Sequence, residues 1–196
     1  MPNPTRNSLM AEAIGSLLGE LDPEPDREGL LETPERAAKA WEYWTKGYHE
    51  DLNSILKSFK DGSHGYDEMI IETDIPLYSK CEHHLADIFG VAHVGYVPNG
   101  SIVGLSKIVR LVEHFARRLQ VQERLTVQIA ETLHTALEAK GVGVILQCRH
   151  MCMEARGINR PSVITTTSCL RGAIKDVASA RAEFISLVNG TKQRQV

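Results

Sequence analysis

The chain has 196 residues, of which 42% are hydrophobic and 24% are charged, and its formal net charge is −3. This size suits one domain of ordinary length with a modest extension. The slight acidity does not favour a nucleic-acid-binding protein, and no apolar run approaches the about 18 residues of a membrane-spanning helix. We therefore expect no nucleic-acid partner and no membrane partner.

The first residues, Met-Pro-Asn-Pro, are not a basic stretch followed by an apolar one, so we see no secretory signal. A cytoplasmic location is the expectation. In a reducing compartment the four cysteines are not expected to form disulfides. Metal binding or packing in the core explains them better.

Two helices are expected near the N-terminus. Apolar residues over 9–21 recur at helical spacing, and the prolines of residues 22–25 end that helix. Thr33 has the residue type of an N-cap and Pro34 that of a first helical position. A second helix should therefore run to about Trp44.

From about residue 68 the pattern changes to short strands and helices. Ser106 has the residue type to cap a helix, and Gly141 has the type to stop the next one. The expected elements are a short helix at 52–59, strands at 69–73, 88–97, 102–103, 142–148 and 162–174, helices over 106–119 and from 125 to Gly141, and a last helix from Asp176.

Strands that pair as hairpins, with helices gathered on one face, give the α+β class. We expect an N-terminal helical extension over residues 1–67, a main domain over 68–190 and a short tail over 191–196.

Four residues suggest a metal centre. Cys81 and His84 are separated by two residues, so one tight turn can direct both to the same point. His150 and Cys152 would lie on the same face of an extended segment. Two thiolates and an imidazole make a three-ligand zinc site, which keeps a fourth position open for water as catalytic zinc does. His83 and His150 are left over beside the ligands and can transfer protons, so the combination predicts a hydrolase that uses zinc-activated water.

These spacings alone leave alternatives open. Cys148 shares a face with Cys152 if the strand is regular, and cysteines packed as small hydrophobic residues are the simpler interpretation. Other enzyme classes are disfavoured, because the chain has no His-Glu-x-x-His, no deaminase signature with Pro-Cys-x-x-Cys and no P-loop.

The charge is uneven along the chain. Residues 106–160 carry nine Lys or Arg and only five Glu. This basic excess coincides with the motif region and would suit a small polyanionic substrate. A solvated basic face explains the charge more simply.

Four segments carry a family resemblance. They are residues 81–84 (Cys-Glu-His-His), 104–110 (Gly-Leu-Ser-Lys-Ile-Val-Arg), 118–124 (Arg-Leu-Gln-Val-Gln-Glu-Arg) and 150–157 (His-Met-Cys-Met-Glu-Ala-Arg-Gly). In this order they closely resemble GTP cyclohydrolase I, and the resemblance extends from about residue 30 to about residue 187.

The resemblance implies that Cys81, His84 and Cys152 are zinc ligands and that the metal lowers the pKa of its bound water. The hydroxide would attack C8 of the guanine of GTP, with His83 and His150 as the proton-transfer pair. A purely supporting role is the alternative for His83. A second hydrolysis would release formate, and rearrangement of the ribose would give 7,8-dihydroneopterin triphosphate, the first step of tetrahydrofolate or pterin biosynthesis.

The resemblance also implies a set of GTP contacts. Glu123 would accept hydrogen bonds from N1–H and the 2-amino group of guanine, with Gln122 near the same pocket. An ordinary solvated charge is the alternative for Glu123. Ser106 would contact the ribose, although helix capping explains it as well. The implied triphosphate ligands are Lys107, Arg110 and Arg156, together with Arg36 and Lys39, for which action from a neighbouring subunit is an open alternative.

The implied fold is the tunnelling fold, in which an antiparallel sheet is backed by two helices and sheets join between subunits into a barrel. Residues 68–190 would then be the catalytic domain. Family members resemble toroidal homodecamers of two stacked pentamers, with sites at subunit junctions. Asp87 stands where we associate an apolar residue or proline with the family. Val91 stands where we associate a lysine with it. Neither is a ligand position.

Two other functions stay open. A non-catalytic member could bind GTP or a regulatory partner, although it would have no need of three ligands and both histidines. A related tunnelling-fold enzyme could act on another pterin or a deazapurine, because Glu123 suits any guanine-like edge. The triphosphate-binding bases favour GTP.

Overall fold

The computed structural model describes residues 6–60 and 65–191 and divides into two compact units, Met1–Lys46 and Gly47–Val196. The short 3-10 turn η1 (Lys46–Tyr48) lies at this division. A catalytic domain confined to residues 68–190 stays a prediction. Within the described ranges, no helix is long and apolar enough to cross a membrane.

The first unit is a pair of helices, α1 (Arg6–Leu21) and α2 (Thr33–Trp44), which pack against each other. The sequence predicts both. Thr33 is the first residue of α2 rather than its cap, because Glu32 occupies the N-cap position without a side-chain hydrogen bond.

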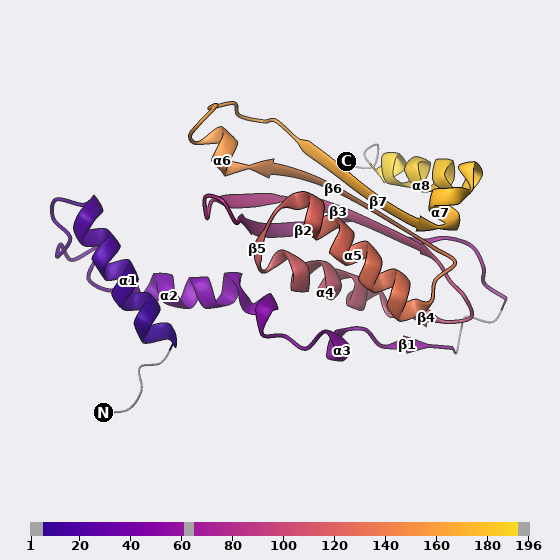
Figure 1. Cartoon of the computed structure of the whole chain (residues 1–196), viewed down its shortest axis with the longest axis horizontal. Helices are drawn as coiled ribbons and strands as arrows, with labels where there is room; N and C mark the ends of the chain where they lie inside the picture. Colours follow the sequence, from indigo (N-terminus) through magenta and orange to yellow (C-terminus); the bar gives the residue numbers. More distant parts are fainter. Residues whose placement is uncertain (1–5, 61–64, 192–196) are drawn as a thin grey trace. The chain divides into compact units, whose positions relative to one another are not determined.

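A five-stranded sheet forms the centre of the second unit, in the order β5-β2-β3-β6-β7 (Figure 1). All neighbouring strands are antiparallel except β5, which runs parallel to the end of β2. The strands are β2 (Ile70–Cys81), β3 (Asp87–Val97), β5 (Leu119–Gln120), β6 (Gly141–His150) and β7 (Thr165–Gly172).

Strand β2 continues well beyond the strand predicted at residues 69–73. Asp74 has a left-handed backbone with a φ of 56°, and the pairing with β3 shifts register between Glu72 and Ile75. Such a bulge absorbs an irregular residue without ending the strand. The strand therefore runs on to Cys81, the first candidate metal ligand.

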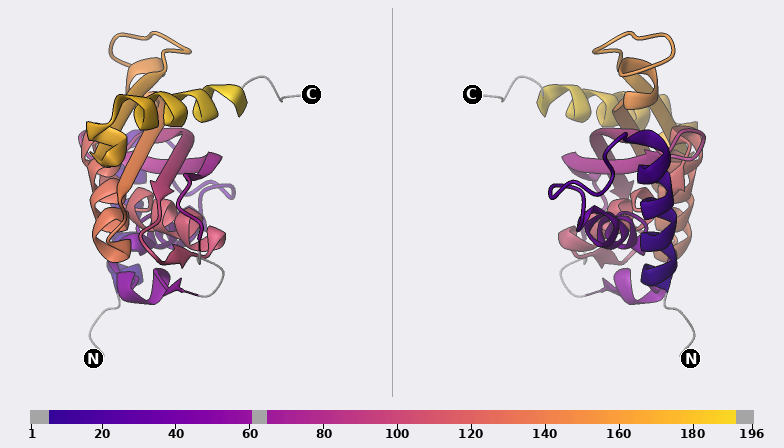
Figure 2. Two further views of the ribbon diagram at one scale, coloured as in Figure 1. Left: turned by 90° about the vertical axis from the view of Figure 1, so that its right-hand side faces the viewer. Right: turned by 90° about the vertical axis from the view of Figure 1, so that its left-hand side faces the viewer.

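Helices α4 (Leu105–Ala116) and α5 (Gln122–Leu137) cover one face of the sheet (Figure 2). Val144 of β6 is fully buried in the same cluster as Leu111 of α4 and Ile129 of α5. The α+β class and the two backing helices are confirmed.

The other face is partly covered by α7 (Ala173–Asp176) and α8 (Ala178–Thr191), so the expectation that all helices gather on one face is wrong. Phe184 of α8 is fully buried there. A Cβ on Gly95 or Gly143 would come within 3.0 or 2.8 Å of its ring, so both positions need glycine. The predicted last helix is confirmed as α8, which begins at Ala178, but the strand expected at 162–174 is shorter, because α7 takes the place of its end.

The remaining elements are short. The helix expected at 52–59 ends early, as α3 (Leu52–Ile55), and is followed by β1 (Ser58–Phe59). Strand β1 pairs with β4 (Ile102–Val103) in a separate two-stranded sheet.

Two predicted helix boundaries are wrong. Gly104, not Ser106, is the N-cap of α4, and no side-chain hydrogen bond is made there. Helix α5 ends before Gly141, because Glu138 takes the left-handed conformation with a φ of 46°. Gly141 instead begins β6, where a Cβ would lie 2.8 Å from the backbone nitrogen of Ile174.

Candidate metal centre and active site

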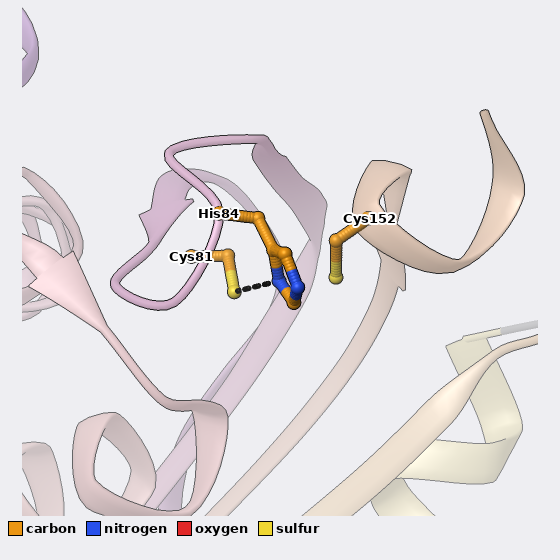
Figure 3. Close-up of side chains that lie close together, drawn as sticks. All are labelled: Cys81, His84 and Cys152. Atoms are coloured by element: carbon orange, nitrogen blue, oxygen red, sulfur yellow. Dashed lines mark hydrogen bonds between the residues drawn. The ribbon is translucent and has the colours of Figure 1, made fainter. Parts of the chain in front are cut away.

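The turn between β2 and β3 carries Cys81 and His84. The N–H of Cys81 donates to the carbonyl of Ala86, and that of Leu85 donates to the carbonyl of Cys81, each at 2.8 Å. Leu85 has a φ of 56°, the left-handed conformation that closes a tight turn. The turn brings Cys81 Sγ to 3.7 Å from His84 Nδ1, as the two-residue spacing predicts (Figure 3).

Strand β5 joins this turn to the start of α5. Cys81 pairs with Gln120, and the N–H of Glu82 donates to the carbonyl of Gln120 at 3.1 Å. One residue separates β5 from α5, so Gln122 and Glu123 lie at the same end of the sheet. Two motifs that are distant in the sequence meet there.

Strand β6 brings the last motif to the same place. Ile88, near the start of β3, pairs with His150, the last residue of β6. The chain then turns into α6 (Met151–Glu154). The prediction that His150 and Cys152 share one face of an extended segment is therefore wrong, because the strand ends between them. The helical turn nevertheless points the Cys152 thiol toward the other candidate ligands (Figure 3).

Cys81, His84 and Cys152 form a group that could hold a metal ion. One donor atom from each lies within 4.8 Å of the others. Burial is the main cause that raises the pKa of the Cys152 thiol. The neighbouring Cys81 raises it further, because a second thiolate beside the first is unfavourable without a cation. Thiolates and imidazoles are donors that zinc prefers, and three protein ligands leave a fourth position for water. The donor set therefore fits a catalytic zinc ion.

Cys148 does not belong to this group. Its side chain lies in the buried core and is 1% exposed. Burial raises the pKa of its thiol to about 12. Because its side chain packs in the core and lies outside the Cys81–His84–Cys152 group, Cys148 is a core residue rather than a ligand.

A buried amide fixes the orientation of His150. His150 Nε2 lies 2.8 Å from Oε1 of Gln122. The amide nitrogen of Gln122 faces three acceptors: the carbonyls of Leu146 at 3.3 Å and Thr165 at 2.9 Å, and the hydroxyl of Thr167 at 3.1 Å. These acceptors settle which end of the amide is the nitrogen. Oε1 must therefore accept from Nε2–H of His150, so in the neutral ring Nδ1 carries no proton.

The two candidate proton-transfer histidines differ in their surroundings. Burial lowers the pKa of His150, and the charge of Glu123 opposes that shift. The side chain of His83 is 63% exposed, and its Nδ1 lies 4.0 Å from Cys81 Sγ. A neutral His150 in a defined tautomer is suited to accept a proton at Nδ1.

Two ion pairs, which the sequence reasoning missed, hold the segments that carry the ligands. Glu82 pairs with Arg124 of α5, and this arginine lowers the pKa of the Glu82 carboxyl. Arg149 at the end of β6 pairs with Glu154 at the end of α6. All four residues lie within or beside the quoted motifs. No spacing rule, however, shows which charges become partners after folding.

Three of the predicted GTP contacts lie at this end of the sheet. Glu123 is exposed in the first turn of α5, and Arg156 is exposed in the segment after α6. The positive charge of Arg156 lowers the pKa of the Cys152 thiol, against the larger effect of burial. Gln122, by contrast, is 2% exposed, and its amide is engaged by the protein itself.

The other predicted contacts belong to two other helices. Ser106, Lys107 and Arg110 belong to the first turns of α4, which begins at the opposite end of the sheet (Figure 1). A helix of 12 residues spans about 18 Å, so one chain does not bring them to the metal group. Arg36 and Lys39 lie on α2, in the first unit.

Comparison with known proteins gives the family. The sequence pattern of GTP cyclohydrolase I matches residues 10–189. The chain belongs to the GTP cyclohydrolase I family.

Proteins named GTP cyclohydrolase 1 resemble the chain over most of its length. That of Nitrosospira multiformis is 57% identical over 171 residues, which cover 87% of this chain and 90% of the relative. That of Corynebacterium glutamicum is 49% identical and covers 91% of each chain. That of Coxiella burnetii is 49% identical over 93% of this chain and 98% of its own.

Membership confirms the predicted family and its enzyme class. The family hydrolyses GTP in the first step of pterin and folate biosynthesis and depends on zinc. The Cys-His-Cys group at the end of the sheet agrees with that dependence.

Proposed function

We propose that this chain is a zinc-dependent hydrolase that converts GTP and water to 7,8-dihydroneopterin triphosphate and formate. The observation that carries the proposal is the meeting of Cys81, His84 and Cys152 beside His150 in a member of this family. These three side chains would hold the zinc ion. When bound, zinc supplies the Lewis acidity that makes water nucleophilic at neutral pH.

His150 and His83 would move the protons of ring opening. The hydrogen bond to Gln122 occupies Nε2 of His150, so Nδ1 is the atom that would accept and return a proton. His83 is exposed enough to reach substrate. Gln122 then acts through His150 as a positioning residue, in place of the direct GTP contact that the resemblance implies.

Glu123 would recognise guanine, because its exposed carboxylate can accept from N1–H and the 2-amino group together. Arg156 would bind phosphate beside the metal group. Ser106 would contact the ribose, and Lys107 and Arg110 would bind the triphosphate through charge-assisted hydrogen bonds. Arg36 and Lys39 would add further phosphate contacts.

The separation of Lys107 and Arg110 from the metal group within one chain supports an oligomer in which subunits complete each other's sites. Among the described strands, β7 is an edge, and β5 covers β2 only at Lys80 and Cys81. Exposed edges must be paired or protected, and joining them between subunits would close a barrel. We propose a homodecamer of two pentamers, located in the cytoplasm.

The decisive test incubates purified, zinc-loaded protein with GTP and assays formate together with fluorescent, oxidised neopterin phosphate. Both products should form and should disappear after chelation. Cys152→Ser should lose zinc and turnover, whereas His150→Ala should keep zinc and lose turnover by about 10²-fold or more.

Cys169→Ser is the matched control, because Cys169 is a buried thiol of β7 outside the metal group. It should keep both zinc and turnover. Tight GTP binding with neither product would reject the enzyme and favour a GTP-binding protein. Retained turnover in Cys152→Ser would reject the ligand set.

A further inference from the structure

An arginine–glutamate pair brackets the segment that presents His150 and Cys152. Arg149 Nε donates to Oε1 of Glu154 at 2.7 Å, and Nη2 of the same arginine pairs with Oε2. The contact is thus bidentate, the geometry in which guanidinium and carboxylate bind best. The Glu154 side chain is 5% exposed, so this carboxylate is buried against its partner.

Both ends of the pair are anchored. Arg149 pairs across the sheet with Phe89 of β3, and its guanidinium lies 5.2 Å from the centre of the Phe89 ring. The Glu154 carboxylate also makes a hydrogen bond with the backbone of Ser162. The carboxylate therefore connects the end of β6, α6 and the segment that follows.

The turn between these anchors needs outside support. Helix α6 has four residues, too few for a helix to be stable alone in water. Within it, the N–H of Ala155 donates to the carbonyl of Met151 at 2.9 Å. Cys152 sits on this turn, whereas Cys81 and His84 sit on the closed hairpin of β2 and β3. The position of α6 thus decides whether the third ligand meets the other two.

We propose that the Arg149–Glu154 pair presets Cys152 for the metal, and that it sets zinc affinity rather than the chemistry of the loaded site. The inference rests on the proposed ligand set. Residues that orient metal ligands typically change affinity by about 10–100-fold when removed. Without the pair, α6 would have to be ordered by the metal itself, and zinc binding would weaken.

The test is a zinc titration against a chromophoric chelator, with the purified full chain. Glu154→Gln keeps the size of the side chain but removes its charge, and it should weaken zinc binding about tenfold. Arg149→Lys keeps the charge but loses the two-pronged contact, and it should weaken binding in the same direction. Turnover of both variants should rise toward the wild-type value as zinc is added.

Glu131→Gln is the matched control. Glu131 accepts from Arg171 Nε at 2.7 Å, an ion pair of the same chemistry away from the metal group. It should keep wild-type zinc affinity. If it loses as much affinity as Glu154→Gln, or if Glu154→Gln and Arg149→Lys both bind zinc like the wild type, the inference is overturned.

Two further variants separate the possible failures. Cys152→Ser should weaken zinc binding far more than Glu154→Gln. If Cys152→Ser binds zinc normally, the ligand set itself is wrong and the inference falls with it.

The double variant Arg149→Glu/Glu154→Arg should recover part of the zinc affinity lost by each single reversal. No recovery would show that the two residues do not act as a pair.

Discussion

At the level of single residues, Gln122 bonds His150 inside the protein, which its place in the motif does not reveal. It stands beside Glu123 in sequence, yet successive helix positions point in different directions. Glu123 is exposed, whereas Gln122 points into the protein and bonds His150, Thr165 and Thr167. Thr126 extends this network, since its hydroxyl lies 2.6 Å from that of Thr167. In the proposed mechanism, Glu123 would bind the substrate while Gln122 would position His150.

We predict that Gln122→Leu lowers kcat by about 10²-fold with little change in zinc content, because small misplacements of a catalytic group have effects of this size. The leucine fills the same space but leaves Nε2 of His150 without an acceptor. Single-turnover kinetics and zinc analysis would measure both. Gln128→Leu on the same helix is the control and should turn over normally. Equal losses in kcat for both variants would point to general damage to α5.

At the element scale, the site depends on how strands and helices end. Strand β5 has only two residues, yet it fixes the start of α5 beside the β2–β3 turn that carries Cys81 and His84. Strand β6 stops at His150, and α6 begins at once. Each ending places one functional side chain.

The C-terminal end of α5 offers a stability test. Glu138 holds a left-handed conformation there, which costs an ordinary side chain about 1–2 kcal/mol relative to glycine. Glu138→Gly should therefore raise the free energy of unfolding by about 1 kcal/mol, measured by denaturant titration at fixed protein concentration. Glu138→Ala retains the Cβ and should not stabilise. A stabilisation of the same size in Glu138→Ala would assign the effect to charge instead of backbone strain.

At the scale of the whole molecule, the metal group and the α4 residues occupy opposite ends of the sheet of one chain. Lys107 and Arg110 can then bind the triphosphate of a GTP molecule at a metal group only if that metal group belongs to another subunit. Assembly would thus be a condition for turnover rather than an accessory to it.

This predicts complementation between inactive variants. Cys152→Ser and Lys107→Ala/Arg110→Ala should each show little turnover, and subunits of the two assembled together should regain a measurable part of it. Two variants of the metal end, Cys152→Ser and His84→Ala, should not rescue each other. Light scattering should give a mass about ten times the 21.8 kDa of the chain. A mixed assembly that stays inactive would contradict shared sites.

Features that depend on neighbours along the chain could be predicted before the fold was known. Hydrophobic periodicity predicted α1, α4 and α5, and the Thr33-Pro34 pair predicted α2. The two-residue spacing of Cys81 and His84 predicted one tight turn. The four ordered motifs identified the family. Local propensity and short-range geometry suffice for such features.

Features that depend on distant partners emerged only with the folded chain. The bulge at Asp74 prolonged β2, and α6 replaced the expected extended segment around Cys152. Burial in the sheet removed Cys148 from the candidate ligands, and acceptors on Leu146, Thr165 and Thr167 oriented the amide of Gln122 so that its oxygen faces His150. Which polar groups become partners is decided by strand pairing over long sequence distances, because a buried polar group must find a hydrogen-bonding partner wherever the fold provides one.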